Sequence, residues 1–143
     1  MTVQAILSVK GSEVLTIEPT TNLAAAAKIL GERKIGALVV TGPDRRVIGI
    51  VSERDIVQEL AAHGAASLDL PLTDVMTRKV MTCSASDTIS SVMEKMTQGR
   101  FRHLPVLDQG RLTGIVSIGD IVKHRLAEME SEQSALRDYI QTA

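Results

Sequence analysis

The apolar residues of this chain follow a helical spacing in two separate places. In each place they recur at intervals of three and four residues, which predicts a helix with one buried face. Ser, Thr, Asp or Pro residues precede both stripes and suit a helix start. Gly31 and Gly99 follow the stripes, where we expect the helices to end. The stripes consist of Leu23, Ala26, Ala27 and Leu30, and of Ile89, Val92, Met93 and Met96.

Short apolar runs typical of strands lie around each predicted helix. One run comes before the helix, at 14–17 and again at 80–83, and two more follow it around a polar turn. A second helix then closes each group, at 53–63 and at 118–129. The predicted order is strand, helix, strand, strand, helix, and it occurs twice. The paired runs read ALVV and RVIGIVS in the first group, and LPVL and RLTGIVS in the second.

The two groups are also similar in sequence. GIVSERDIV, starting at Gly49, returns as GIVSIGDIV, starting at Gly114. The similarity extends backwards through KIGALVV and RFRHLPV, so the repeating units span 11–64 and 73–127. A linker at 65–72 joins the units, and a helical tail at 128–143 follows them. A unit of about fifty-five residues buries little surface by itself, so we expect the two sheets to pack together.

Composition narrows the class of protein. The chain has 143 residues, 44% of them apolar and 23% charged, with a net charge of −1, which favours a folded domain. One Tyr, one Phe, no Trp and no basic block argue against a nucleic-acid surface. The single cysteine excludes an internal disulfide and a multi-cysteine metal site. The apolar runs are too short to span a bilayer, and the first residues do not resemble a signal peptide, so we expect a cytoplasmic protein.

A polar pattern recurs at the same place in both units. Ser52 and Asp55, like Ser117 and Asp120, stand three residues apart where a strand passes into a helix. This spacing is typical of a capping box, in which the two side chains satisfy free backbone N–H groups. A helix start also suits an anionic ligand, and a carboxylate there can accept both hydroxyls of a ribose. The pattern is compatible with both interpretations.

The units differ where a phosphate would bind. Arg102 and His103 precede a strand of the second unit, and this pair suits a phosphate clamp or an ordinary surface ion pair. The first unit has Gly36 and Ala37 there, which leave more room. Arg54 of the first unit is either a further phosphate contact or a solvated helix residue. We therefore expect two unequal sites.

Together these motifs resemble those of a tandem cystathionine-β-synthase-type (CBS) domain pair, also called a Bateman module, in its stand-alone bacterial form. The resemblance covers most of the chain, from about 11 to 127. It implies an α+β fold of two β-α-β-β-α repeats, packed through their sheets as a pseudo-two-fold pair. It also implies clefts between the two units that take adenine nucleotides.

The resemblance implies a role for particular residues. The acid of each Ser-x-x-Asp would hold the ribose, a residue of each first strand would lie near the base, and the segment before each second strand would line a cleft. The nucleotide-binding residues implied are Thr16, Ile35, Gly36, Ala37, Ser52, Arg54, Asp55, Thr82, Arg102, His103, Pro105, Ser117 and Asp120.

The resemblance further implies a regulatory module without catalysis, in which AMP, and also ATP or NAD(H), would be the ligand. We expect a homodimer and a separate regulated protein. Cys83 lies in an apolar run and His124 lacks a partner at metal-ligand spacing, so we expect no catalytic residues and no metal. The alternative is a structural or dimerisation module whose nucleotide clefts are vestigial. The apolar positions of the tail predict docking onto its own domain or onto a second subunit.

Overall fold

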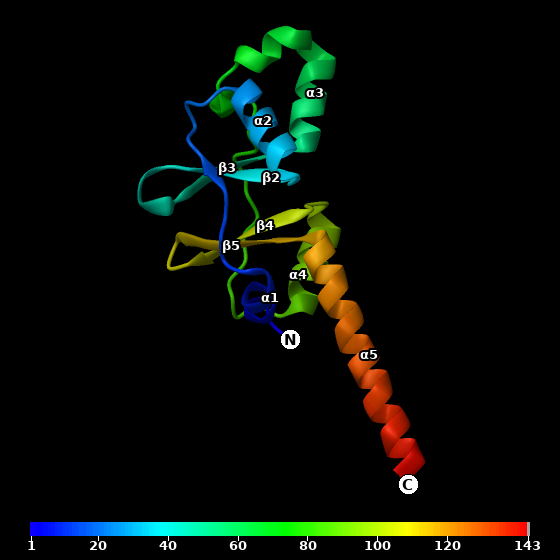
Figure 1. Cartoon of the computed structure of the whole chain (residues 1–143). Coiled ribbons are helices and arrows are strands. Elements are labelled where there is room, and N and C mark those ends of the chain that lie inside the picture. Colours follow the sequence, from blue (N-terminus) through cyan, green and yellow to red (C-terminus); the bar gives the residue numbers. More distant parts are fainter. Residues whose placement is uncertain (143) are drawn as a thin grey trace.

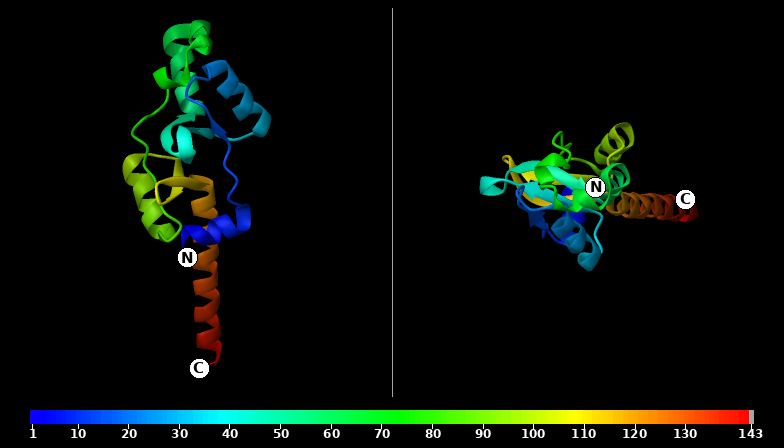
Figure 2. Two further views of the ribbon diagram at one scale, coloured as in Figure 1. Left: turned by 90° about the vertical axis from the view of Figure 1, so that its left-hand side faces the viewer. Right: turned by 90° about the horizontal axis from the view of Figure 1, so that it is seen from above.

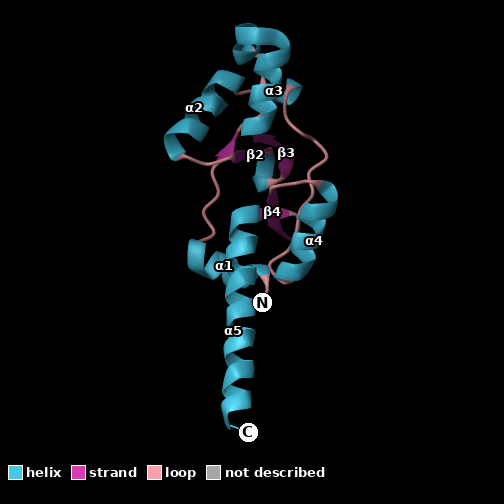
Figure 3. Cartoon of the chain, turned by 90° about the vertical axis from the view of Figure 1, so that its right-hand side faces the viewer, coloured by secondary structure: helices cyan, strands magenta, loops and turns pink. Residues whose placement is uncertain are grey.

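In the computed structural model, which describes residues 1–142, strands lie between the outer helices (Figures 1 and 3). The predicted α+β class and the two packed repeats are confirmed. The first unit contains β1 (Thr16–Ile17), α2 (Leu23–Arg33), β2 (Ala37–Thr41), β3 (Val47–Ser52) and α3 (Glu53–His63). The second contains α4 (Ile89–Gly99), β4 (His103–Asp108), β5 (Arg111–Ser117) and α5 (Ile118–Thr142). A further helix precedes both units, α1 (Val3–Lys10), and short 3-10 helices occupy Pro43–Arg45, Gly64–Asp69 and Leu72–Asp74.

The two sheets are unequal. In the first, β1 runs parallel to β2, which pairs antiparallel with β3; in the second, β4 pairs antiparallel with β5. The predicted strand at 80–83 is wrong, because this stretch makes only one isolated bridge, from Cys83 to Val106. The strand predicted at 14–17 is shortened to Thr16–Ile17. Both stretches keep only one buried residue near the sheet, since Met81 and Leu15 are exposed.

The helices begin as predicted, and α4 ends at the predicted Gly99, but α2 does not end at the predicted Gly31. The side chains of Asn22 and Thr88 accept hydrogen bonds from backbone N–H groups of the first turns of α2 and α4. However, α2 continues through Gly31, and Lys34 takes the left-handed conformation after it (φ 54°). After α4, Arg100 does the same (φ 58°). The left-handed residue that follows each helix is therefore a basic residue and not a glycine.

Two apolar cores stabilise the fold, and each contains a segment from outside its own unit. Helix α1 precedes the first unit but contributes Val3, Ile6 and Leu7 to the core of the second. Leu72 and Met76 lead into the second unit but lie in the core of the first. The two leading segments thus cross between the units. The sequence did not predict α1, because its packing partners in the core begin only at Cys83, far along the chain.

This crossing explains the glycine that recurs in both GIVS stretches. A Cβ atom on Gly114 would stand 2.8 Å from Cδ2 of Leu7, and one on Gly49 would collide with Sδ of Met76. Both glycines are therefore covered by the crossing segments.

The hairpin turns hold the units together by reciprocal contacts. Nε of Arg45 donates to the carbonyl oxygen of Leu112 at 3.2 Å, and Nε of Arg111 donates to that of Asp44 at 3.3 Å. Each arginine reaches across to the other unit. The arrangement follows the pseudo-two-fold relation between the repeats.

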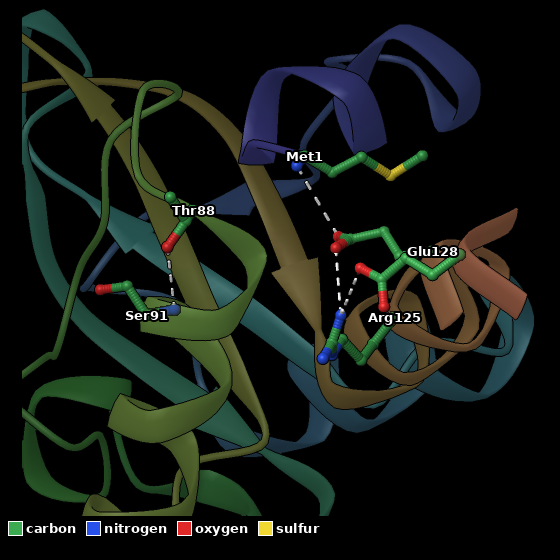
Figure 4. A network of polar contacts seen from close by, with 6 residues as sticks. Met1, Thr88, Ser91, Arg125 and Glu128 are labelled. Carbon is green, nitrogen blue, oxygen red and sulfur yellow. Dashed lines mark hydrogen bonds and ion pairs between the residues drawn. The ribbon is translucent and has the colours of Figure 1, made fainter. Parts of the chain in front are cut away.

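Helix α5 runs without interruption into the tail and projects away from the body (Figures 1 and 2). Its base is anchored where Glu128 accepts from Nη1 of Arg125 at 3.2 Å and lies 3.8 Å from the backbone nitrogen of Met1 (Figure 4). The expected docking of the tail onto its own domain is wrong, because the residues after 129 are exposed. Within residues 1–142, no helix combines the length and the apolar character needed to cross a bilayer.

Candidate nucleotide clefts

Two cavities lie where the units meet, and both include Gly36, Ala37 and His103. The first cleft has a volume of about 270 Å³ and the second about 370 Å³. The first is lined further by Ile50, Ser52, Glu53, Arg54, Asp55, Thr77, Arg100, Phe101 and Arg102. The second is lined further by Lys10, Glu13, Val14, Leu15, Lys34, Ile35, Ile115 and Ser117.

Each cleft combines the helix start of one unit with the segment before the second strand of the other. In the first cleft, the start of α3 with Asp55 faces the segment 100–103 of the second unit. In the second cleft, Ser117 faces the segment 34–37 of the first unit. Two larger hollows, of about 580 and 650 Å³, contain neither Ser–Asp pair. The chemistry implied by the repeat therefore gathers in the two smaller cavities.

Both Ser–Asp pairs form capping boxes. The Ser52 N–H donates to Oδ2 of Asp55 at 2.9 Å, and the Asp55 N–H donates to Oγ of Ser52 at 3.3 Å. The equivalent distances for Ser117 and Asp120 are 2.9 and 3.1 Å. Within residues 1–142, every hydrogen bond to the carboxylates of Asp55 and Asp120 uses Oδ2, and none reaches Oδ1 of either aspartate. Capping therefore occupies one carboxylate oxygen and leaves the other available.

The second aspartate has a partner that the first lacks. Nζ of Lys10 donates to Oδ2 of Asp120 at 2.7 Å and to the carbonyl oxygen of Ile115 at 3.1 Å. Burial by itself favours the neutral acid, but the Lys10 bond and the Ser117 N–H outweigh burial and hold the pKa of Asp120 below its ordinary value. Lys10 lines the second cleft and Asp120 does not. The ammonium thus covers the carboxylate that the sequence assigned to a ribose.

His103 lies between the clefts and lines both. Burial lowers the pKa of His103 from its ordinary value, and the positive charges of Lys10 and Arg102 lower it further. The carboxylates of Asp120 and Glu53 raise the pKa but do not cancel this decrease. The ring is therefore mostly neutral at pH 7. His103 therefore provides a hydrogen-bonding group to both clefts and little positive charge.

The structure separates some of the remaining sequence-predicted site residues from the clefts. Ile35 lines the second cleft, but Thr16 lines the 650 Å³ hollow instead. Pro105 is buried inside β4, where its carbonyl oxygen accepts from the Cys83 N–H at 3.0 Å. Thr82 lies in none of the four cavities.

Sequence reasoning missed several residues that line the clefts. Lys34 and Arg100 occupy equivalent positions in the two units, and both line a cleft from a left-handed conformation that favours glycine. A basic residue at the start of both KIGALVV and RFRHLPV was the available signal. Lys10 and Thr77 gave no such signal, since only the crossing of the leading segments brings them to the clefts.

Comparison with known proteins agrees with this architecture. A family model described as CBS domain matches residues 8–62 and 72–127. The crystal structure of a CBS-domain containing protein from Agrobacterium tumefaciens is 47% identical, covers 87% of this chain and 99% of that chain, and gives a TM-score of 0.84. The CBS domain pair of protein MJ0100, in complex with 5′-methylthioadenosine and S-adenosyl-L-methionine, is 27% identical over 90% and 98% of the two chains, with a TM-score of 0.80.

Curated relatives are of different lengths. CBS domain-containing protein YhcV of Bacillus subtilis is 29% identical over 87% of each chain. The mitochondrial CBS domain-containing protein CBSX3 of Arabidopsis thaliana is 34% identical over 81% of this chain, which spans 58% of that protein. The CBS domain-containing protein CBSCBSPB1 of the same plant is matched over only 22% of its length. With two matched repeats and two cores, the chain belongs to the CBS domain family as a CBS domain pair.

Proposed function

We propose that this protein is a regulatory module that binds an adenine nucleotide in the first cleft and catalyses no reaction itself. One observation carries the proposal: the Ser52–Asp55 helix start of one unit faces the basic segment 100–103 of the other across a cavity of about 270 Å³. The free Oδ1 of Asp55 suits the ribose hydroxyls. The cavity's volume of about 270 Å³ is slightly below the roughly 300–1,000 Å³ typical of small-ligand sites.

The charge of the first cleft favours a phosphorylated ligand. Arg54, Arg100 and Arg102 line it against the two carboxylates of Glu53 and Asp55. Arginine binds phosphate oxygens through a planar fork of donors. The related domain pair of MJ0100 binds S-adenosyl-L-methionine and 5′-methylthioadenosine. Both ligands contain the adenosine group that is also present in AMP, ATP and NAD(H). The three arginines disfavour the sulfonium cation and favour AMP, with ATP or NAD(H) as longer alternatives.

The second cleft suits an anionic ligand less well. Lys10 is already engaged with Asp120, and Glu13 lies in the same lining as Lys34. A ribose that approaches Asp120 must compete with an ammonium at 2.7 Å. We therefore assign the higher nucleotide affinity to the first cleft.

A purely binding role fits the chemistry of Cys83. This thiol lies in the core of the second unit, and burial raises its pKa to about 11, so it stays protonated at neutral pH. A protonated, buried thiol is a poor nucleophile. Among residues 1–142, no group of three or more His, Cys, Asp or Glu side chains is placed to hold a metal ion.

The module acts through a second copy of itself and through a separate regulated protein. Nucleotide bound between the units would favour one arrangement of the two, and the effect is limited by the difference in affinity for the two arrangements. Exposed apolar side chains on α3 and α5, Val57 and Val122 among them, provide a surface for the homodimer.

Isothermal titration calorimetry with AMP tests the assignment. We expect saturable binding with one AMP per chain, a rise in melting temperature, and weaker heat with S-adenosyl-L-methionine. Asp55→Asn removes the charge that receives the ribose and should weaken AMP binding at least about tenfold.

Asp120→Asn is the matched control, since it alters the equivalent acid of the second unit. It should leave AMP affinity within about twofold, because Asp120 does not line the first cleft. If only Asp120→Asn lost AMP binding, the nucleotide site would have to be assigned to the second cleft. No heat with AMP, ATP or NADH would favour the structural module with vestigial clefts.

A further inference from the structure

The projecting part of α5 carries an apolar stripe with a seven-residue repeat. Its members lie four or three residues apart in strict alternation, which is the spacing of the a and d positions of a coiled coil. Their exposed fractions range from 43% to 65% where they are apolar, and one member is polar. The stripe consists of Val122, Leu126, Met129, Gln133, Leu136 and Ile140.

The body of the protein leaves this stripe uncovered. Only Ile121 of α5 is buried, and Glu128 lies 3.8 Å from the backbone nitrogen of Met1, just before α1. Beyond this point every described residue of the helix is exposed. A single helix with exposed apolar side chains in water gains stability mainly from a partner that buries them.

We propose that the α5 helices of two copies pair in parallel and in register as a two-stranded coiled coil. The inference rests on the homodimer proposed above and specifies how its tails associate. The charges beside the stripe select the partner and the direction. Arg125 and Glu132 occupy g positions, and Glu130 and Arg137 occupy e positions.

In a parallel pair, each g residue faces the e residue five positions further along the other helix. Arg125 then faces Glu130, and Glu132 faces Arg137, so both of these charged pairs are attractive. An antiparallel pair with the same apolar residues opposed would place Glu130 against Glu130 and Glu132 against Glu132. The charges therefore favour the parallel arrangement of identical chains.

Gln133 supports the same register. In a parallel pair it meets its own copy at an a position, where the two amides can hydrogen-bond to each other. A polar residue at an a position specifies register at a cost in stability. In the antiparallel arrangement Gln133 would instead face Met129, which offers its amide no comparable partner.

Disulfide trapping tests direction and register. Gln133→Cys places two thiols across the interface of a parallel pair, within the Cα distance of about 4.4–6.8 Å that a disulfide requires. Mild oxidation should convert most of this variant to a covalent dimer. Wild type should stay uncrosslinked, because Cys83 is buried. The matched control Ser134→Cys faces away from the stripe and should crosslink much more slowly.

A mixed sample tests the alternative direction. Efficient crosslinking of Met129→Cys to Gln133→Cys, without crosslinking of Gln133→Cys to itself, would show antiparallel helices and overturn the proposal. Preferential crosslinking of Ser134→Cys would overturn it as well, since another face of the helix would then form the contact.

Charge reversal gives an independent measurement. Glu132→Arg and Arg137→Glu each turn two attractive pairs into repulsive ones, and each should weaken dimerisation by about tenfold in sedimentation equilibrium. Mixed in equal amounts, the two variants should form a heterodimer close to wild-type affinity. Asp138→Arg, an exposed reversal away from the interface, should have little effect.

The outcomes separate this inference from the homodimer itself. The wild type could dimerise while neither charge reversal weakens the dimer and Gln133→Cys does not crosslink. That result would support the homodimer and contradict the coiled coil. A wild-type monomer at about 10 µM would remove both the homodimer and the coiled coil. AMP titration reports on the cleft separately in either case.

Discussion

Nζ of Lys10 lies 2.7 Å from Oδ2 of Asp120, although the two residues are 110 positions apart. The contact links the end of α1 to the start of α5. It provides a partner for the second ribose candidate that the first, Asp55, does not have. The two clefts of a duplicated sequence thereby become chemically different.

The Lys10–Asp120 pair should stabilise the fold at pH values where Asp120 is ionised. Lys10→Met should lower the free energy of unfolding at pH 7 by about 1 kcal/mol, since the pair is partly exposed. The pKa of Asp120 is lowered in the folded state, so this contribution is present above the unfolded pKa of about 3.9 and is lost as pH falls through the folded value.

Urea unfolding at pH 7 and pH 3 measures this difference. A double-mutant cycle with Asp120→Asn isolates the pair. An equal loss from Lys10→Met at both pH values would contradict the charged interaction and would indicate that only the packing of the lysine stem matters.

The arginines of the first cleft should contribute to phosphate binding and not to adenosine binding. Arg102→Ala and Arg100→Ala should each weaken AMP affinity by roughly tenfold, as expected for loss of a hydrogen bond between charged groups. Affinity for adenosine, which lacks phosphate, should change little. Calorimetry with both ligands makes the comparison, and Arg46→Ala, away from both clefts, serves as the control. Parallel losses for AMP and adenosine would mean that the arginines only maintain the shape of the cleft.

Gly114 should tolerate no side chain while Leu7 packs on it. Gly114→Ala places a Cβ 2.8 Å from Cδ2 of Leu7 and should destabilise the protein by about 1–3 kcal/mol, the range for overpacking. Leu7→Val in the same chain should recover part of that loss. Chemical denaturation of the two single variants and the double variant measures the coupling. Strict additivity would show that Gly114 is needed for its backbone conformation and not for the approach of α1.

Cys83 should make the fold sensitive to alkaline pH. Burial raises its folded pKa to about 11, whereas the thiol of an unfolded chain titrates near 8.5–9. The stabilising contribution is therefore complete below the unfolded pKa and is lost as pH rises through about 11. The difference in unfolding free energy between wild type and Cys83→Val should shrink from pH 8 to pH 11 by about 2 kcal/mol. A constant difference over this range would contradict the buried thiol.

Local patterns in the sequence were sufficient for much of the architecture. The spacing of apolar residues located α2 and α4, and the Ser–Asp pairs marked the starts of α3 and α5. These features depend on residues three or four positions apart, so neighbouring side chains and backbone groups determine them. The end of α2 was not predicted correctly, and the strand predicted at 80–83 is an isolated bridge, because both depend on what the remainder of the fold buries.

What the sequence determined by itself is the duplication: two units with the same order of elements, each with a Ser–Asp pair at a helix start. Only the tertiary structure decided which residues share a cleft. It placed Asp55 opposite Arg100 and Arg102 of the other unit, and it brought Lys10 to Asp120. The physical reason is that these contacts arise from packing between the units, across dozens of intervening residues, and no local spacing records which surfaces will meet.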